Sequence, residues 1–394
     1  MENSLSCQEA RDYILHAQRL DGLKQKSNVL DATLLNIEQL GYVQIDTICV
    51  VQRAHHHVLW ARNPSYETSH LDSLVKDKKV FEYWSHAASY LPMSEYRFSL
   101  PRKQAILKGE QKFWFDKDEK LMNAVLQRIS NEGPLRAKDF EHTGIKAKAW
   151  SSKPTKKALE YLYMQGDLMI SSRVNFHKVY DLTQRVLPKD INATIPKEEE
   201  YIRFLIIKYL KANVLGQASH MAYLLKNTKN LLMNALNQMY ENKELIQVNV
   251  QGDNYYALAG LYDLKVKPSD ASSLKILSPF DNLLIQRKRM QKLFDFDYLL
   301  ECYLPEAKRK YGYFSLPILW DGKLVARMDC KADKKESMLH IHNIVLEANI
   351  NDIALFALAL YQELNLFLVF NKCNDFVLHK SSPSHFKSIF QKLL

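Results

Sequence analysis

An amide and a carboxylate stand two residues apart between Gly41 and Thr47, where the chain reads Gly-Tyr-Val-Gln-Ile-Asp-Thr. The β-branched residues of this segment favour a short strand, and successive side chains of a strand alternate between its two faces. We therefore expect Gln44 and Asp46 to point the same way and to hold one water molecule between them. A carboxylate placed in this way can accept a proton from that water.

Cationic and hydrogen-bonding side chains follow this pair at once. The segment 52–62 predicts a helix that carries Arg53, the three histidines 55–57 and Arg62. Such groups are natural partners of phosphate, so we predict nucleic-acid contacts at Arg53, His55, His56 and Arg62. Consecutive helical residues are rotated by about 100°, so the three histidines do not converge on one metal ion.

A structural role is the alternative for the same residues. Asp46 or Thr47 would then be the N-cap of the following helix, because both side chains accept hydrogen bonds from free backbone N–H groups. Gln44 would be an ordinary solvent-facing strand residue. On spacing alone this alternative is the commoner one, since helix caps outnumber catalytic carboxylates.

An internal repeat predicts the architecture that positions the pair. Residues 158–170 align without a gap with residues 235–247, and each copy ends a helix and enters a strand. A polar turn and a second strand follow each copy, at 179–182 and 255–258, and helices at 118–130 and 198–211 precede them. Helices closed by a β-hairpin are the winged-helix plan. Helices at 6–20 and 30–40 and the strand of the Gln44 motif suggest a third, less regular copy.

The chain changes character after Leu261. Strand patterns at 314–320, 323–331 and 338–346 are joined in one case by an Asp321-Gly322 turn, which is typical of a hairpin. We predict an α+β protein of about three tandem winged-helix domains followed by a C-terminal β-barrel-like domain. The expected boundaries are 1–115, 116–190, 191–262 and 263–394, with a closing helix in the last domain.

Composition favours a polyanionic partner. The 394 residues carry a formal net charge of +10, and cations that neutralise phosphates release condensed counterions. Basic clusters recur in successive modules, although each alone is more often a solvated face. Besides the helix at 52–62, we predict DNA contacts at Lys156, Lys157, Arg173, His177, Arg287, Arg289 and Lys310.

No cofactor or metal is expected. The five cysteines contain no Cys-x-x-Cys pair, which fits reduced thiols of the cytoplasm, and His340 and His342 share a strand face without a third ligand nearby in sequence. The apolar segment 353–370 contains Gln362, Glu363 and Asn365, which would be costly in hydrocarbon. We expect a buried helix there, a cytoplasmic protein that is nucleoid-associated when bound to DNA, and no membrane partner.

The amino-acid sequence, over nearly the whole chain, resembles the YcaQ (AlkX) family of DNA glycosylases, which unhook interstrand crosslinks. The motif of that family is Gln-Φ-Asp, with Φ apolar, and it stands here as Gln44-Ile45-Asp46. Three further blocks match in order, at 83–92 (Tyr-Trp-Ser-His), 278–283 (Ser-Pro-Phe-Asp-Asn-Leu) and 305–313 (Pro-Glu-Ala-Lys-Arg-Lys-Tyr-Gly-Tyr). The related AlkZ branch carries Gln-Φ-Gln, so Asp46 places this chain on the YcaQ side.

The resemblance implies a monofunctional glycosylase that hydrolyses the N-glycosidic bond of N7-alkylated purines, crosslinks included, and leaves abasic sites. Asp46 would stabilise the positive charge that develops on the sugar, and Gln44 would orient the attacking water. The expected partner is double-stranded DNA with alkylated purines or crosslinks, bound by a monomer. The alternative is a winged-helix DNA-binding regulator without catalytic activity, in which Gln44 and Asp46 are structural.

Overall fold

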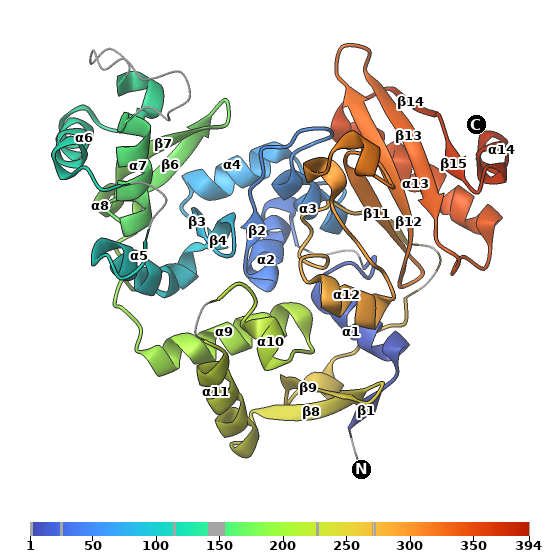
Figure 1. The fold of residues 1–394 in the computed structure, drawn as a ribbon, viewed down its shortest axis with the longest axis horizontal. Coiled ribbons are helices and arrows are strands. Elements are labelled where there is room, and N and C mark those ends of the chain that lie inside the picture. The colour runs from blue at the N-terminus through green and yellow to red at the C-terminus, as the bar shows by residue number, and fades with distance from the viewer. Residues whose placement is uncertain are drawn as a thin grey trace. The chain divides into compact units, whose positions relative to one another are not determined.

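The computed structural model describes residues 3–23, 27–112, 116–140, 154–225, 228–269, 271 and 273–393, which form several small sheets and many helices (Figure 1). The chain divides into two compact units, one of residues Met1–Glu67 with Ile202–Leu394 and one of residues Thr68–Tyr201. The first division, after Glu67, falls inside the predicted N-terminal domain 1–115. The four predicted domains therefore stay predictions.

The first unit begins with two capped helices. Strand β1 (Ser4–Leu5) precedes α1 (Cys7–Ala17), whose N-cap Ser6 forms a reciprocal capping box with Glu9. Helix α2 (Val29–Leu40) has Asn28 as its N-cap, and this side chain accepts a hydrogen bond from the Asp31 N–H. Both helices lie close to the ranges predicted from the sequence.

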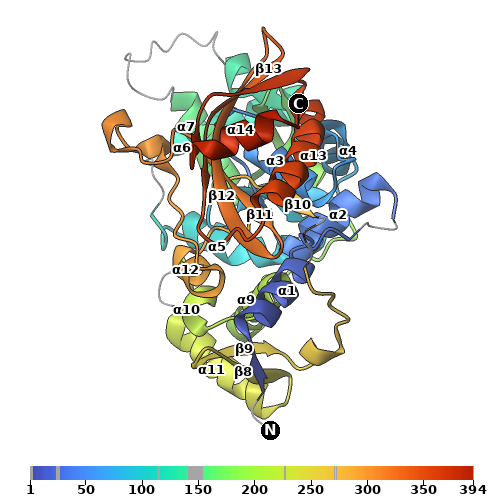
Figure 2. The same cartoon turned by 90° about the vertical axis from the view of Figure 1, so that its right-hand side faces the viewer.

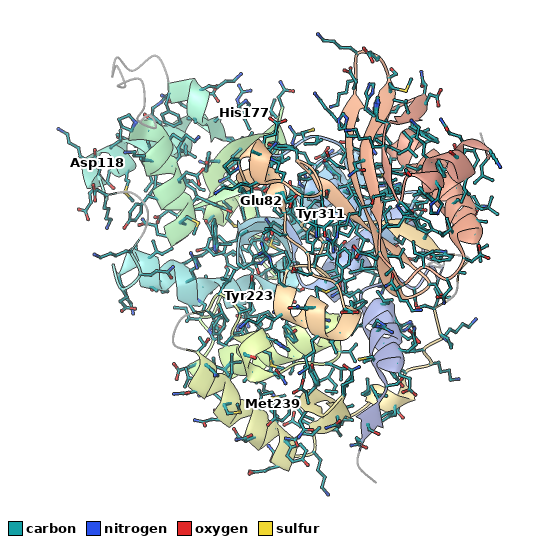
Figure 3. All side chains as sticks on the ribbon, turned by 45° about the vertical axis from the view of Figure 1, so that its right-hand side comes forward. Glu82, Asp118, His177, Tyr223, Met239 and Tyr311 are labelled. Atoms are coloured by element: carbon teal, nitrogen blue, oxygen red, sulfur yellow. The ribbon has the colours of Figure 1, made fainter. Side chains whose placement is uncertain are left out.

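A helical cluster of this unit is closed by a β-hairpin. It contains α9 (Glu198–Asn213), α10 (Ala218–Met221), α11 (Lys229–Glu241), β8 (Leu245–Val250) and β9 (Asp253–Leu258), with η3 (Leu261–Asp263) after it. β1 pairs with β8 in parallel, and the buried side chains of Ile206, Leu232 and Leu236 form the core with Met239, which Figure 3 labels. The described elements follow the order predicted for a winged helix, while the number of such domains stays a prediction.

A six-stranded sheet completes the first unit. Its order is β10 (Leu274–Ile276), β11 (Ser315–Trp320), β12 (Lys323–Asp333), β13 (Met338–Leu346) and β14 (Asp375–Leu378), with β15 (Ser381–Ser382) also on β13. Asp321 and Gly322 both have positive φ, 51° and 69°, and form the predicted turn between β11 and β12. Within the described part of the chain β10 and β14 do not pair, so the predicted barrel closure is not confirmed.

Helices α12 (Arg287–Phe294), α13 (Ile353–Asn371) and α14 (His385–Gln391) belong to the same unit. Figure 2 shows α13 and α14 on one face of the sheet. By length and composition alone α13 could cross a membrane. Its side chains Phe356, Leu364 and Phe367 are nevertheless fully buried in the fold, so packing on the sheet explains its apolar character.

The second unit contains one hairpin and one small three-stranded sheet. Helix α4 (Thr68–Lys76) precedes the hairpin of β3 (Val80–Trp84) and β4 (Ala88–Pro92), then η1 (Met93–Ser99) and α5 (Leu100–Leu107). The sheet has the order β5 (Leu135–Arg136), β7 (His177–Leu182), β6 (Leu168–Val174), and its helices are α6 (Glu119–Glu132), η2 (Ala137–Phe140), α7 (Pro154–Gln165) and α8 (Thr183–Val186). These helices and strands follow the order expected from the sequence, and the second winged helix itself stays a prediction.

Candidate active site

The Gln44 motif lies directly after helix α2 and is held in place by the segment 278–283. Strand β2 covers only Val43–Gln44, and the side-chain amide of Asn282 donates a 2.9 Å hydrogen bond to the Tyr42 carbonyl. Asp46 therefore lies beyond the strand, and strand alternation does not set its direction as we expected. A local turn sets it, because Asp46 Oδ1 accepts a 2.8 Å hydrogen bond from the Ile48 N–H.

The two motif side chains differ in exposure. Gln44 is 8% exposed, whereas Asp46 is half-buried and Thr47 is exposed. Burial raises the pKa of Asp46, and the N–H groups of Ile48 and Thr47 partly oppose that rise. In the described part of the chain no arginine, lysine or histidine forms an ion pair with the Asp46 carboxylate.

Helix capping does not explain Asp46 or Thr47. The next helix, α3 (Ala54–Arg62), begins well after them and has Arg53 at its N-cap position. Instead, the Ile48 N–H donates a hydrogen bond to Asp46, which closes a turn in a part of the chain without regular secondary structure. The capping alternative from the sequence is therefore not supported for either residue.

Helix α3 is a core helix, which corrects several predicted DNA contacts. His55 is 1% exposed, and His57 is fully buried with its Nε2 2.9 Å from the Ile276 carbonyl oxygen. His56 is half-buried, with its Nδ1 2.8 Å from the Tyr66 hydroxyl. Burial, and then the charge of Arg53, lower the pKa of His56 to about 4, so this ring is neutral at pH 7. His55 does not reach the surface, and His56 carries no charge for a phosphate.

The predicted DNA contact at Arg62 is also wrong, because this side chain forms a buried ion pair. Its guanidinium makes two hydrogen bonds of 2.7 and 2.9 Å to the Asp281 carboxylate, and both side chains are 0% exposed. Further hydrogen bonds reach the carbonyl oxygens of Gln18 and Val58. The family-like block 278–283 thus makes two contacts in this region. Asp281 accepts hydrogen bonds from Arg62 of helix α3, and Asn282 donates one to the Tyr42 carbonyl beside the motif.

The remaining predicted DNA contacts divide by exposure. Arg289 is 2% exposed and donates to Asn213, and Arg173 forms a two-bond ion pair with Glu82 at 2.6 and 2.7 Å. The predicted DNA contact at Arg289 is therefore wrong, because this residue lies in the interior. The guanidinium of Arg173 is already paired with the Glu82 carboxylate. Lys156, His177, Arg287 and Lys310 are exposed, and Arg53 and Lys157 are half-buried.

A segment that sequence reasoning passed over lies next to the motif. The charge of Asp46 acts on the Cys302 thiol and the Tyr303 phenol and contributes, after burial, to raising the pKa of both. These two residues belong to the turn η4 (Glu301–Tyr303), which directly precedes the family-like block 305–313. Only that block carried a sequence signal, so Tyr303 had none of its own.

The histidines of β13 are stacked with a third one. The rings of His340 and His342 have centroids 6.3 Å apart, and His379 lies 5.5 Å from His340. Across the described residues no group of three or more histidine, cysteine or acidic side chains is arranged to hold a metal ion.

Comparisons with known proteins identify the family and the fold of the chain. The model of the AlkZ-like DNA glycosylase family matches residues 37–370. A solved structure, the Streptomyces sahachiroi DNA glycosylase AlkZ, superposes with a TM-score of 0.64 at 16% identity, over 95% of this chain and 99% of that chain. At this identity the superposition shows the shared fold. The family match spans most of the chain, and the chain therefore belongs to the AlkZ-like DNA glycosylases, enzymes that act on DNA in its repair.

Proposed function

We propose that this glycosylase hydrolyses the N-glycosidic bond of N7-alkylated purines, interstrand crosslinks included, and leaves an abasic site. The observation that carries the proposal is the environment of the Asp46 carboxylate. Its carboxylate is half-buried, is oriented by the Ile48 N–H, and has no cationic partner among the described residues. A carboxylate held in this way is available to a positive charge on the substrate.

The chemistry of N7-alkylated purines suits such a site. Alkylation at N7 makes the base cationic, so the base departs as a neutral molecule without a general acid. The enzyme must instead stabilise the sugar, where positive charge develops at C1′ and the ring oxygen as the bond lengthens. Asp46 stabilises this charge and accepts a proton from the attacking water. Gln44, on the strand two residues earlier, orients that water.

The product we propose is an abasic site in an uncut strand. Strand cleavage by a bifunctional glycosylase needs an amine that forms a Schiff base with the sugar. The segment from Gly41 to Arg62 contains no lysine beside the motif, and a water molecule is the proposed nucleophile. The reaction is then a single hydrolysis.

Exposure supports the inclusion of crosslinks. A nucleotide tethered to the opposite strand cannot rotate freely into a deep pocket, as in ordinary base flipping. Asp46 lies in a turn whose neighbours Thr47 and Cys49 are exposed. An open position of this kind is compatible with a base that stays in the duplex.

Duplex DNA is held, in this proposal, by the exposed basic residues. The proposed phosphate contacts are the exposed Lys156, His177, Arg287 and Lys310 and, in addition, the half-buried Arg53 and Lys157. We propose a monomer, because several modules in one chain can clasp a duplex without a dimer partner. The five free thiols are consistent with action in the cytoplasm.

Product analysis on defined substrates tests this function. One duplex carries N7-methylguanine, a second carries a nitrogen-mustard crosslink between N7 atoms, and a third is undamaged. After incubation and heating in alkali, strand breaks report abasic sites, and the Asp46→Asn variant is the matched control. We expect the wild-type protein to give breaks in both damaged duplexes well above the uncatalysed background, and Asp46→Asn to leave the breaks near that background. Binding of damaged duplex without any base release would favour the non-enzymatic regulator.

A further inference from the structure

A solvent-exposed aromatic side chain lies within electrostatic reach of the Asp46 carboxylate. Tyr303 is 73% exposed, at the end of η4. Tyrosine carries a large apolar ring, and a ring that is so exposed contributes little to the core. The charge of Asp46 contributes, after burial, to raising the pKa of its phenol, so the two side chains are within electrostatic reach of each other. The nearby Tyr313 is a second exposed tyrosine, at 42%.

The segment that carries Tyr303 is anchored at its base by a buried carboxylate. Glu301 is 5% exposed and accepts hydrogen bonds from three consecutive backbone N–H groups, those of Lys310 at 3.0 Å, Tyr311 at 2.7 Å and Gly312 at 3.1 Å. This closes residues 301–312 into a loop that includes the turn η5 (Glu306–Lys308). The loop therefore keeps a defined shape without a partner.

The end of the loop is fixed to the six-stranded sheet. The guanidinium of Arg327, on β12, lies 4.2 Å from the ring centre of Tyr311, which Figure 3 labels. Gly312 has a φ of 131°, and a Cβ atom there would lie 2.2 Å from Cγ of Asp329, so only glycine fits. Asp329 in turn accepts a 2.9 Å hydrogen bond from the Phe314 N–H.

The face of this loop has the composition of a nucleic-acid contact. Lys308 and Lys310 are exposed, and the guanidinium of Arg309 lies 5.0 Å from the ring centre of Tyr313. Cations near exposed aromatic rings combine phosphate attraction with base stacking. An anchored loop therefore presents an aromatic ring within electrostatic reach of the carboxylate that we propose acts on the sugar.

We propose that Tyr303 probes the lesion: its ring stacks in the duplex beside the alkylated nucleotide and holds that site open in front of Asp46. This inference rests on the proposed function of Asp46. A base that cannot leave the duplex still has to be partly unstacked before its sugar is accessible. An inserted side chain does this by replacing the lost stacking. Tyr303 is exposed, stands on a loop anchored through Glu301, and lies within electrostatic reach of Asp46, as this role requires.

Single-turnover kinetics on the N7-methylguanine duplex test the role of the ring. Tyr303→Ala should slow base release by roughly ten- to hundredfold, the loss expected for one base–aromatic stack. Tyr303→Phe should stay near the wild type, because the ring and not the hydroxyl is required. The control is Tyr262→Ala, which removes another exposed tyrosine of the same unit, in η3, and should leave the rate unchanged. A wild-type rate for Tyr303→Ala would overturn the proposal while leaving the proposed function intact.

A second measurement does not depend on base release. A duplex with a stable abasic analogue and an adjacent 2-aminopurine reports insertion of a side chain as a change in fluorescence. The wild type and Tyr303→Phe should give the same change, and Tyr303→Ala should lose it while still binding the duplex. This reading stands even if N7-alkylated DNA is not the substrate, so the two proposals can fail separately. An identical fluorescence change with Tyr303→Ala would contradict the probing role.

Discussion

Two aspartates of the first unit contrast a carboxylate that stabilises the fold with one that we propose takes part in the chemistry. Asp281 is fully buried, and the Arg62 guanidinium neutralises it through two hydrogen bonds. Asp46 is half-buried, is oriented by the Ile48 N–H and has no cationic partner among the described residues. A carboxylate that is already paired stabilises the fold, whereas one that is oriented and unpaired can receive a charge that appears only during a reaction.

The same substitution at the two positions should separate these roles most strongly. Asp46→Asn should lower the single-turnover rate of base release by roughly a hundred- to ten-thousandfold, the range for electrostatic and acid–base contributions, with the free energy of unfolding unchanged. Asp281→Asn leaves the Arg62 charge buried without its partner, which should cost about 3–5 kcal/mol of unfolding free energy. Denaturant titrations and single-turnover assays on both variants check this. Destabilisation by Asp46→Asn with retained activity would reverse the assignment.

Gln44→Ala sharpens the comparison within the motif itself. We expect base release to fall by roughly ten- to hundredfold, because the attacking water loses an orienting amide. Affinity for the damaged duplex should change little, since Gln44 is 8% exposed and not a phosphate contact. Single-turnover rates and equilibrium binding measured side by side decide this. A loss of binding with a normal rate at saturation would show that Gln44 shapes the DNA surface instead.

The pH dependence of the rate should carry the signature of Asp46. Burial raises the pKa of this carboxyl above that of an ordinary aspartate, and the proposed reaction uses its ionised form. Activity is therefore full above the raised pKa and falls as the pH drops through it, at a higher pH than an ordinary aspartate would give. A pH–rate profile under single-turnover conditions, corrected for uncatalysed base loss, reveals this limb. The limb should be absent from the residual rate of Asp46→Asn.

Charge reversal on the exposed basic residues should give the smallest effects on chemistry. Reversing Arg287 and Lys288 together, or Lys156 and Lys157 together, should weaken binding to damaged and intact duplex alike. The slope of log affinity against log salt concentration should become shallower by about two units per variant if both residues contact phosphates. Base release at saturating enzyme should survive. Unchanged affinity and slope in both variants would assign these residues to solvated faces.

Local patterns in the sequence predicted much of the fold and the motif. The range 338–346 matches β13, and the Asp321-Gly322 turn joins the strands as expected, because turn chemistry and alternation act over a few residues. The errors arose where burial decides. Arg62 and Arg289 have the residue type of a phosphate contact, but distant partners, Asp281 and Asn213, draw them into the interior.

Tyr303 shows the opposite limit of sequence reasoning. A lone tyrosine before a proline-containing block has no periodicity, and its proposed role depends on a fold that brings residue 303 within electrostatic reach of residue 46. The anchoring of its loop depends on Glu301, which accepts from backbone groups about ten residues further along the chain. Contacts of this kind become visible only in three dimensions.

Binding of a charged sugar analogue tests the central claim most directly. One duplex carries a pyrrolidine whose protonated nitrogen replaces C1′ and mimics the developing positive charge, and a matched duplex carries the neutral tetrahydrofuran. If Asp46 is reserved for that charge, the wild-type protein should bind the cationic duplex at least about a hundredfold more tightly than the neutral one. Asp46→Asn should lose this preference while binding the neutral duplex as before. Equal affinity of the wild type for both duplexes, or an undiminished preference in Asp46→Asn, would contradict the account.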